Sequence, residues 1–242
     1  DVLYGGTGLG QDLLYGGASD DIAYGNTGDD SLYGDSGSDT LFGGQGNDAL
    51  FGGADNDTLQ GGQGNDTLLG GTDNDSILGG SGNDALSGEE GVDSLFGNSG
   101  ADSLFGGNGD DFIYGNTGAD ILAGGLGNDM LAGGQGDDTI TADSGNDTVL
   151  GGQGNDMVSG VDGNDLIYGN QGNDTLSGDI GADSLHGGAG NDLLAGGDDA
   201  DRLAGNSGAD LIYGNAGTDI MYGNQGNDTF YGGADADTLY GG

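Results

Sequence analysis

The sequence predicts an all-β protein in which short strands coil into two facing parallel sheets. Three observations support this prediction. A repeat of nine residues runs through nearly the whole chain, glycine opens each repeat, and an apolar residue recurs near its end. A fixed short repeat is typical of a solenoid, whose units stack on their neighbours. A period of nine fits neither an α-helix nor simple alternation along one long strand.

Residues 43–51, GGQGNDALF, show the repeat most plainly, and they define positions one to nine. Because glycine adopts backbone angles that other residues avoid, positions one to six are predicted to form a turn. Positions seven to nine then form a minimal strand, whose eighth side chain points inward. Two such units close one coil of about 18 residues, which gives about 13 turns for the chain.

The composition excludes several classes of partner. The 242 residues include 63 glycines and 42 acidic residues, and the formal net charge is −41. The chain has no cysteine and hence no disulfide framework. Its single Lys or Arg residue, Arg202, argues against binding nucleic acid. No segment approaches the roughly 18 apolar residues of a membrane span, so no membrane insertion is expected. Cations are the expected partners of so much negative charge.

Aspartate occupies the sixth position of every repeat from residue 12 to residue 237. Because two repeats make one turn, alternate aspartates belong to two separate rows. The first row contains Asp12, Asp30, Asp48, Asp66, Asp84, Asp102, Asp120, Asp138, Asp156, Asp174, Asp192, Asp210 and Asp228. The second row contains Asp21, Asp39, Asp57, Asp75, Asp93, Asp111, Asp129, Asp147, Asp165, Asp183, Asp201, Asp219 and Asp237.

The spacing of these aspartates predicts a metal site. Stacked parallel turns bring each carboxylate to about 4.8 Å, one strand spacing, from the next in its row. Carboxylates that close cannot all stay ionised unless a cation neutralises them. Calcium takes six to eight oxygens, and glycine-rich turns supply backbone carbonyls to complete the set. Asn and Ser form turns equally well but never occupy this position, which disfavours a purely turn-forming role for aspartate.

The pattern GGxGxDxUx resembles the RTX nonapeptide, the hemolysin-type calcium-binding repeat of secreted bacterial proteins. The resemblance covers nearly the whole chain. It implies a right-handed parallel β-roll, a β-solenoid with calcium between successive turns. Up to about 24 calcium ions are expected from the gaps between the aspartates. It also implies export by a bacterial type I system and an extracellular or cell-surface location.

The domain prediction is a single continuous array over residues 1–242, with no separate domain. Asp1 belongs to the aspartate column but lies 11 positions before Asp12. This excess of two residues predicts an irregular turn at residues 5–11. Because the chain stops inside a repeat at Gly242, we expect it to be a stretch of a longer array or one unit of a fibre.

The two aspartate rows differ in the residues around them. Glycine fills position four throughout the first row, whereas the second row carries non-glycine residues there at five places: Ser19, Asp55, Asp73, Asp199 and Asp235. We therefore expect the first-row metal sites to be the more uniform. Any empty or distorted sites are expected in the second row.

Aromatic residues gather in the outward ninth position, where 14 of the 16 Phe and Tyr side chains lie. Two interpretations remain open. The rings stack on one another and shield the glycine turns, or they form a patch for association with a partner.

No catalytic motif is present, and the only histidine, His186, lies in an outward ninth position, so the protein is not expected to be an enzyme. The favoured function is that of a calcium-binding structural protein, a surface fibril or layer component similar to oscillin-type bacterial surface proteins. Such a protein would self-associate. One alternative is an accessory RTX domain of a secreted protease, lipase or toxin. Another is an adhesive or ice-binding β-roll, which would favour threonine ladders that this chain has only in part.

Overall fold

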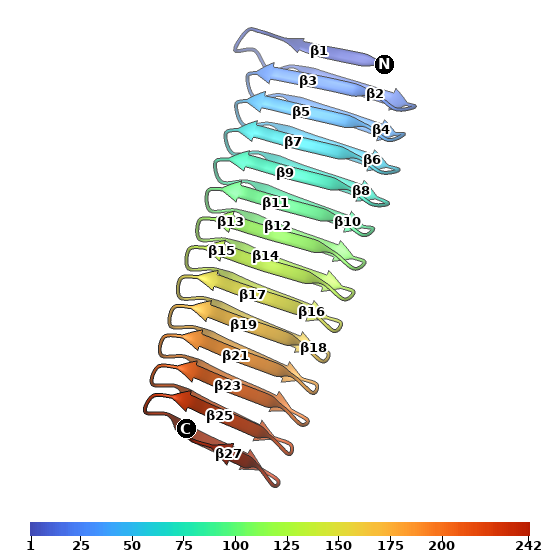
Figure 1. The fold of residues 1–242 in the computed structure, drawn as a ribbon. Coiled ribbons are helices and arrows are strands. Elements are labelled where there is room, and N and C mark those ends of the chain that lie inside the picture. Colours follow the sequence, from blue (N-terminus) through green and yellow to red (C-terminus); the bar gives the residue numbers. More distant parts are fainter. The chain divides into compact units, whose positions relative to one another are not determined.

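The computed structural model describes all 242 residues, which form 27 β-strands and no helix (Figure 1). No helix long and apolar enough to cross a membrane is therefore present. The chain divides into two compact units, residues 1–121 and 122–242. Each unit is a parallel β-solenoid with two strands per turn, and the 27 strands make about 13 turns in all.

In the first unit, odd-numbered strands pair in parallel with odd ones, and even-numbered strands with even ones. We call the two arrays the odd sheet and the even sheet. The odd sheet consists of β1 (Val2–Gly6), β3 (Ile22–Thr27), β5 (Thr40–Gln45), β7 (Thr58–Gln63), β9 (Ser76–Ser81), β11 (Ser94–Ser99) and β13 (Phe112–Thr117). The even sheet consists of β2 (Leu13–Ala18), β4 (Ser31–Ser36), β6 (Ala49–Ala54), β8 (Thr67–Thr72), β10 (Ala85–Glu90) and β12 (Ser103–Asn108).

The second unit repeats this arrangement. Its odd sheet consists of β15 (Met130–Gln135), β17 (Thr148–Gln153), β19 (Leu166–Gln171), β21 (Ser184–Ala189), β23 (Arg202–Ser207), β25 (Ile220–Gln225) and β27 (Thr238–Tyr240). Its even sheet consists of β16 (Thr139–Ser144), β18 (Met157–Asp162), β20 (Thr175–Ile180), β22 (Leu193–Asp198), β24 (Leu211–Ala216) and β26 (Thr229–Ala234). The remaining strand, β14 (Ile121–Leu126), begins at the last residue of the first unit.

The strands are longer than the three residues expected from the repeat. Nearly all have six residues, which are positions seven to nine of one repeat and positions one to three of the next. The glycine at position one is buried and points inward, as Gly43 and Gly61 do. Because an inward glycine needs no space for a side chain, the strand continues through it. The turn is therefore confined to positions four to six.

The core is the apolar column at position eight. Its side chains point between the two sheets, and Leu32, Leu50 and Leu68 are all fully buried. Successive members pair directly in register, as Leu32 does with Leu50 and Leu50 with Leu68. Each turn buries one apolar side chain from each sheet, so no single turn has a core of its own. The fold is stable only as a stack.

Position two adopts a left-handed backbone conformation in every regular turn. Glycine there has a φ angle such as +116° at Gly44, and Asn or Asp replaces it with φ between +70° and +77° at Asn26, Asp35 and Asn224. Asn and Asp tolerate this region better than other side chains do. This explains why the second glycine of the motif is often replaced by these two residues.

The first turn is irregular. Val2 pairs with Ile22, an offset of 20 residues, whereas Ile22 pairs with Thr40 at the usual offset of 18. The additional residues form bends at 7–10, where Leu9 is 93% exposed.

Val161 occupies position two with a φ angle of +82°. A β-branched residue is strained in this region, and a left-handed conformation costs a non-glycine residue roughly 1–2 kcal/mol. Val161→Asn is therefore expected to stabilise the folded protein by about 1 kcal/mol, measured as a higher urea midpoint at fixed calcium concentration. The reverse change in the neighbouring odd strand, Asn170→Val, should destabilise it by a similar amount. An unchanged or lower midpoint for Val161→Asn would contradict this explanation.

Candidate metal centre

The aspartates of the repeat lie at the end of each turn, immediately before a strand. Of the 26, 23 are buried, with 0–3% of the residue surface exposed. The other three, Asp12, Asp228 and Asp237, are half-buried. Such burial is unusual, because an ionised carboxylate is costly to remove from water unless it is paired or bound to a metal.

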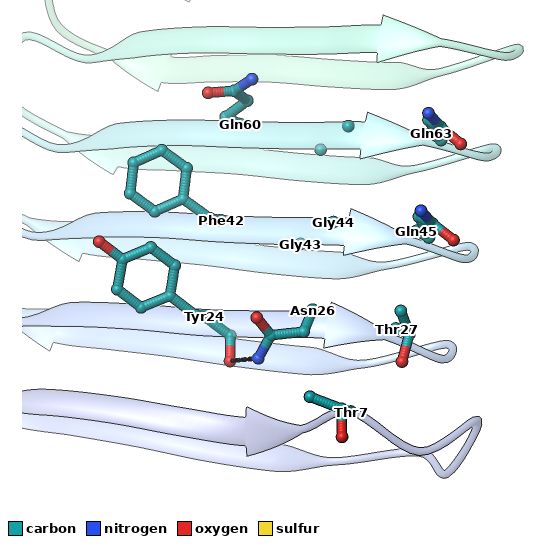
Figure 2. Close-up of a pocket in the computed structure, with 12 residues that line it drawn as sticks. Thr7, Tyr24, Asn26, Thr27, Phe42, Gly43, Gly44, Gln45, Gln60 and Gln63 are labelled. Atoms are coloured by element: carbon teal, nitrogen blue, oxygen red, sulfur yellow. Dashed lines mark hydrogen bonds between the residues drawn. The ribbon is translucent and has the colours of Figure 1, made fainter.

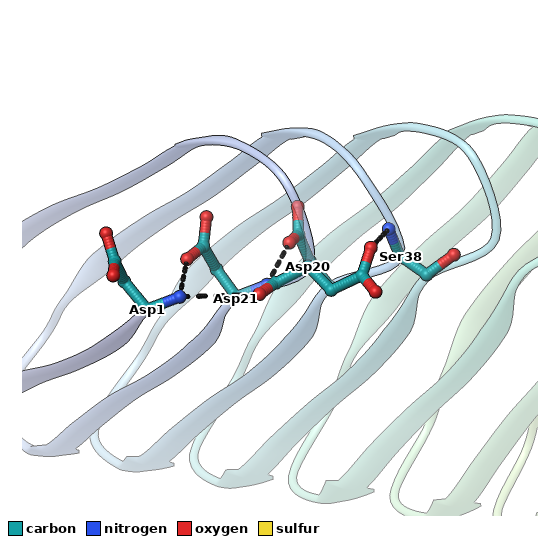
Figure 3. A network of polar contacts seen from close by, with 5 residues as sticks. Asp1, Asp20, Asp21 and Ser38 are labelled. Atoms are coloured by element: carbon teal, nitrogen blue, oxygen red, sulfur yellow. Dashed lines mark hydrogen bonds and ion pairs between the residues drawn. The ribbon is translucent and has the colours of Figure 1, made fainter.

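One oxygen of each carboxylate holds successive turns together. The backbone N–H of Asp30 donates a hydrogen bond of 2.8 Å to Oδ1 of Asp48, and the N–H of Asp39 donates one of 2.7 Å to Oδ1 of Asp57. The same bond recurs along both rows. Figure 3 shows the first turn, where the amino group of Asp1 pairs with Oδ1 of Asp21.

The second oxygen, Oδ2, has no hydrogen-bond partner in any of the 23 buried aspartates. Leaving a buried polar acceptor unsatisfied costs about 1–3 kcal/mol, and more for a charged group. Recurrence of the same unpaired atom in every interior turn indicates that a further group is needed there. A metal cation would satisfy these oxygens.

The glycine at position one makes room for this oxygen. A Cβ atom on Gly25 would lie 2.6 Å from Oδ2 of Asp30 and 2.7 Å from the carbonyl oxygen of Gly43 in the next turn. Both distances are too short for a real side chain. The glycine is therefore required by close approach of the carboxylate and the neighbouring backbone, and its own φ angle is not left-handed.

Backbone carbonyls of the turn supply further oxygens. The carbonyl groups of Asn26 and Gly28 lie directly against Gly44 and Gly46 of the next turn, where no Cβ could be placed. No three carboxylate or imidazole side chains of the chain gather around one point. A cation in this region would therefore take most of its ligands from backbone carbonyls. Calcium accepts such a ligand set, and the residues present fit it.

Burial makes these carboxyl groups hard to ionise without a cation. It raises the pKa of Asp57, Asp75 and Asp201 to about 7, against a backbone hydrogen bond that lowers each value. Burial likewise raises the pKa of Asp48 and Asp156 to about 6. Neighbouring aspartates in the same row raise these pKa values further. A bound divalent cation would reverse the effect, because it favours the charged form.

A second ladder lies on the exposed side of the turns. The N–H of Asn47 donates to Oδ1 of Asp29 at 2.8 Å, and the N–H of Asn65 donates to Oδ1 of Asn47 at 2.7 Å. Asp and Asn serve equally well at this fifth position. The contrast with position six, where only Asp occurs, indicates that hydrogen bonding alone does not explain why every repeat carries a charged residue in the buried rows.

A protein-family model for the RTX calcium-binding nonapeptide repeat matches the chain from end to end, in eight segments that together cover residues 1–242. The chain belongs to the RTX family. RTX repeats bind calcium between turns, and the aspartate ladder that this requires is present. No curated protein matches the chain significantly.

The expected site residues lie where the repeat places them. Within each unit, the structure aligns both rows of aspartates with 18 residues between hydrogen-bonded neighbours. Sequence reasoning did not find two features. One is that Oδ1 accepts a backbone hydrogen bond whereas Oδ2 has no hydrogen-bond partner. The other is the contact of Oδ2 with the glycine at position one. Only the near-invariance of that glycine, broken once by Ala142, indicated such a contact.

The raised pKa values predict how the calcium-free protein responds to pH. A folded-state pKa above the usual 3.8 means that the fold favours the protonated carboxyl group. This contribution to stability is complete below about pH 4 and is lost as the pH rises through 6 to 7. Calcium-depleted protein should therefore show more β-structure by circular dichroism at pH 4 than at pH 8. Greater β-structure at pH 8 without calcium would contradict the prediction.

Proposed function

We propose that the aspartates of both rows, from Asp12 to Asp237, are the side-chain ligands of calcium ions bound between successive turns. The unpartnered Oδ2 atoms carry this proposal. Each interior aspartate lies between two gaps, so about 24 ions is the upper number. Calcium would then contribute its binding free energy directly to folding, because the unfolded chain has no formed site.

The charge of the chain supports the same proposal. About 24 divalent ions would add about 48 positive charges to a chain whose formal net charge is −41. The calcium-free chain is strongly self-repelling, whereas the loaded chain is close to neutral. The acidic residues outside the two rows thus offset the excess positive charge of the bound ions.

The two rows are expected to differ in occupancy. At position four, glycines of the first row have φ angles between +123° and +144° from Gly28 to Gly226. In the second row the angles spread from +73° at Asp199 to +148° at Gly91. This difference supports the prediction that first-row sites are more uniform and that weak or empty sites lie in the second row.

The favoured role is structural, as an extracellular surface fibril or layer component that folds and stiffens outside the cell. RTX repeats are typical of secreted proteins, and here they fill all 242 residues, leaving no segment for a catalytic domain within them. Low cytosolic calcium would keep the chain unfolded and exportable. An accessory role beside a secreted enzyme or toxin is the alternative. A catalytic domain encoded next to this segment would favour it.

Calcium-dependent folding is the direct test. In excess chelator at pH 7.5 the chain should give a disordered circular dichroism spectrum, and in about 10 mM calcium the spectrum of a β-protein. Magnesium at the same concentration serves as the control, since its smaller, rigid octahedral shell suits these carbonyl-rich gaps poorly. A folded solenoid in excess chelator at this pH would refute the proposal.

A single interior aspartate can be tested by an isosteric change. Asp48→Asn keeps an oxygen to accept the N–H of Asp30 but removes the charge. It should reduce the calcium stoichiometry by one or two ions, measured by titration calorimetry with elemental analysis of the dialysed protein. The matched control is Asp29→Asn on the exposed ladder, where Asn47 already performs the same role. Equal stoichiometry in both variants would show that Asp48 is not a ligand.

A further inference from the structure

The acidic residues are distributed very unevenly over the two sheets. No strand of the odd sheet, in either unit, contains a single aspartate or glutamate, although the chain has 42 acidic residues. The odd strands hold one basic residue, Arg202, and otherwise only apolar, hydroxyl and amide side chains, glycine and His186. We call the outward surface of these strands the odd face.

The even sheet is different. Seven acidic residues lie within its strands, at positions two and three of the repeat: Asp35, Glu89, Glu90, Asp143, Asp162, Asp179 and Asp198. Stacked parallel strands avoid ladders of like charge, but this constraint acts equally on both sheets. It therefore does not explain why only one of them is free of acids.

The odd face also carries a groove. An open groove of about 670 Å³ crosses β3, β5 and β7, and glycines including Gly44 and Gly62 line it. Figure 2 shows the residues on either side of it. Aromatic rings form one wall, where Tyr24 stacks on Phe42 with ring centroids 5.0 Å apart. Polar side chains, including Gln45 and Gln63, form the other wall. In this region the face carries a ridge of rings, Tyr4, Tyr24 and Phe42, beside a glycine groove, and the ridge ends at Gln60.

We propose that the odd face binds the odd face of a second copy of this chain. A two-fold axis parallel to the direction in which the strands stack would place the ring ridge of each copy in the glycine groove of the other. The contact would be isologous, as in most homodimers. This inference rests on the proposed function, because it names the surface through which a calcium-loaded structural protein would self-associate.

Charge and area favour a second copy as the occupant. Contact through the odd face brings together strands that carry no carboxylate of their own. Calcium loading would remove most of the long-range repulsion between copies. Seven strands of six residues present a surface of roughly 30 by 20 Å, or about 600 Å², on the odd face of one unit. A standard interface needs about 800 Å² per partner. The odd face of a single unit therefore matches the smaller interfaces of weak, transient complexes, which bury less than about 1,200 Å² in total.

The chain offers a matched pair of variants. Tyr24→Ser with Phe42→Glu changes a stacked pair on the odd face, whereas Tyr33→Ser with Phe51→Glu changes the equivalent pair on the even face, stacked at 4.7 Å. The oligomeric state is measured by analytical ultracentrifugation in about 10 mM calcium, from 1 to 100 µM protein. Circular dichroism and calcium stoichiometry are measured on the same samples.

The wild-type chain and the even-face variant are expected to dimerise, and the odd-face variant to stay monomeric, with at least a tenfold weaker Kd. All three should fold and bind the same amount of calcium. A wild-type chain that folds in calcium but remains monomeric at 100 µM overturns this inference and leaves calcium-driven folding intact. Equal loss of dimer in both variants also overturns it. A third result would also overturn it: the wild-type chain stays monomeric and binds a neutral polysaccharide, and the odd-face variant loses that binding. The odd face would then bind another ligand.

Discussion

A buried carboxylate oxygen that lacks a partner is the constraint on which the rest of this structure depends. It recurs in 23 of the 26 repeat aspartates, in both rows, and the chain has a single Lys or Arg side chain, Arg202, to neutralise so many carboxylates. The solenoid can hold such an atom either protonated or beside a metal ion. As the pH rises through 6 to 7 the protonated form is lost, so above this range the proposed calcium ions would be what allows the fold to form.

The glycine pattern follows from the same constraint. The first glycine of the repeat leaves space for the carboxylate of its own turn, and the second and third permit left-handed backbone that aims carbonyl groups at the next turn. Glycine at these places lowers the stability of an isolated strand. Under the proposed function, a bound cation would offset that loss by joining oxygens from two turns, so the glycine pattern and metal binding would be linked.

Much of the fold and of the candidate site could be predicted from the sequence, because a strict repeat is compatible with few folds. The period of nine predicts two sheets, and the unbroken column from Asp12 to Asp237 predicts the carboxylate rows. The strand length could not be predicted, because glycine at position one reads as a turn signal when its inward orientation is unknown. The left-handed conformation of Val161 could not be predicted either, because the residues around it give no sign of backbone strain.

The coil closes after two repeats, so the chain should tolerate the gain or loss of two repeats better than the gain or loss of one. Loss or duplication of 18 residues leaves every later strand in the sheet to which it belonged. Loss of nine residues moves every later strand into the opposite sheet. Acidic residues of the even strands, such as Glu89 or Asp143, would then lie on the odd face. Recombination between repeats should therefore have preserved whole coils, and engineered arrays of this protein should be shortened or extended only in multiples of 18 residues.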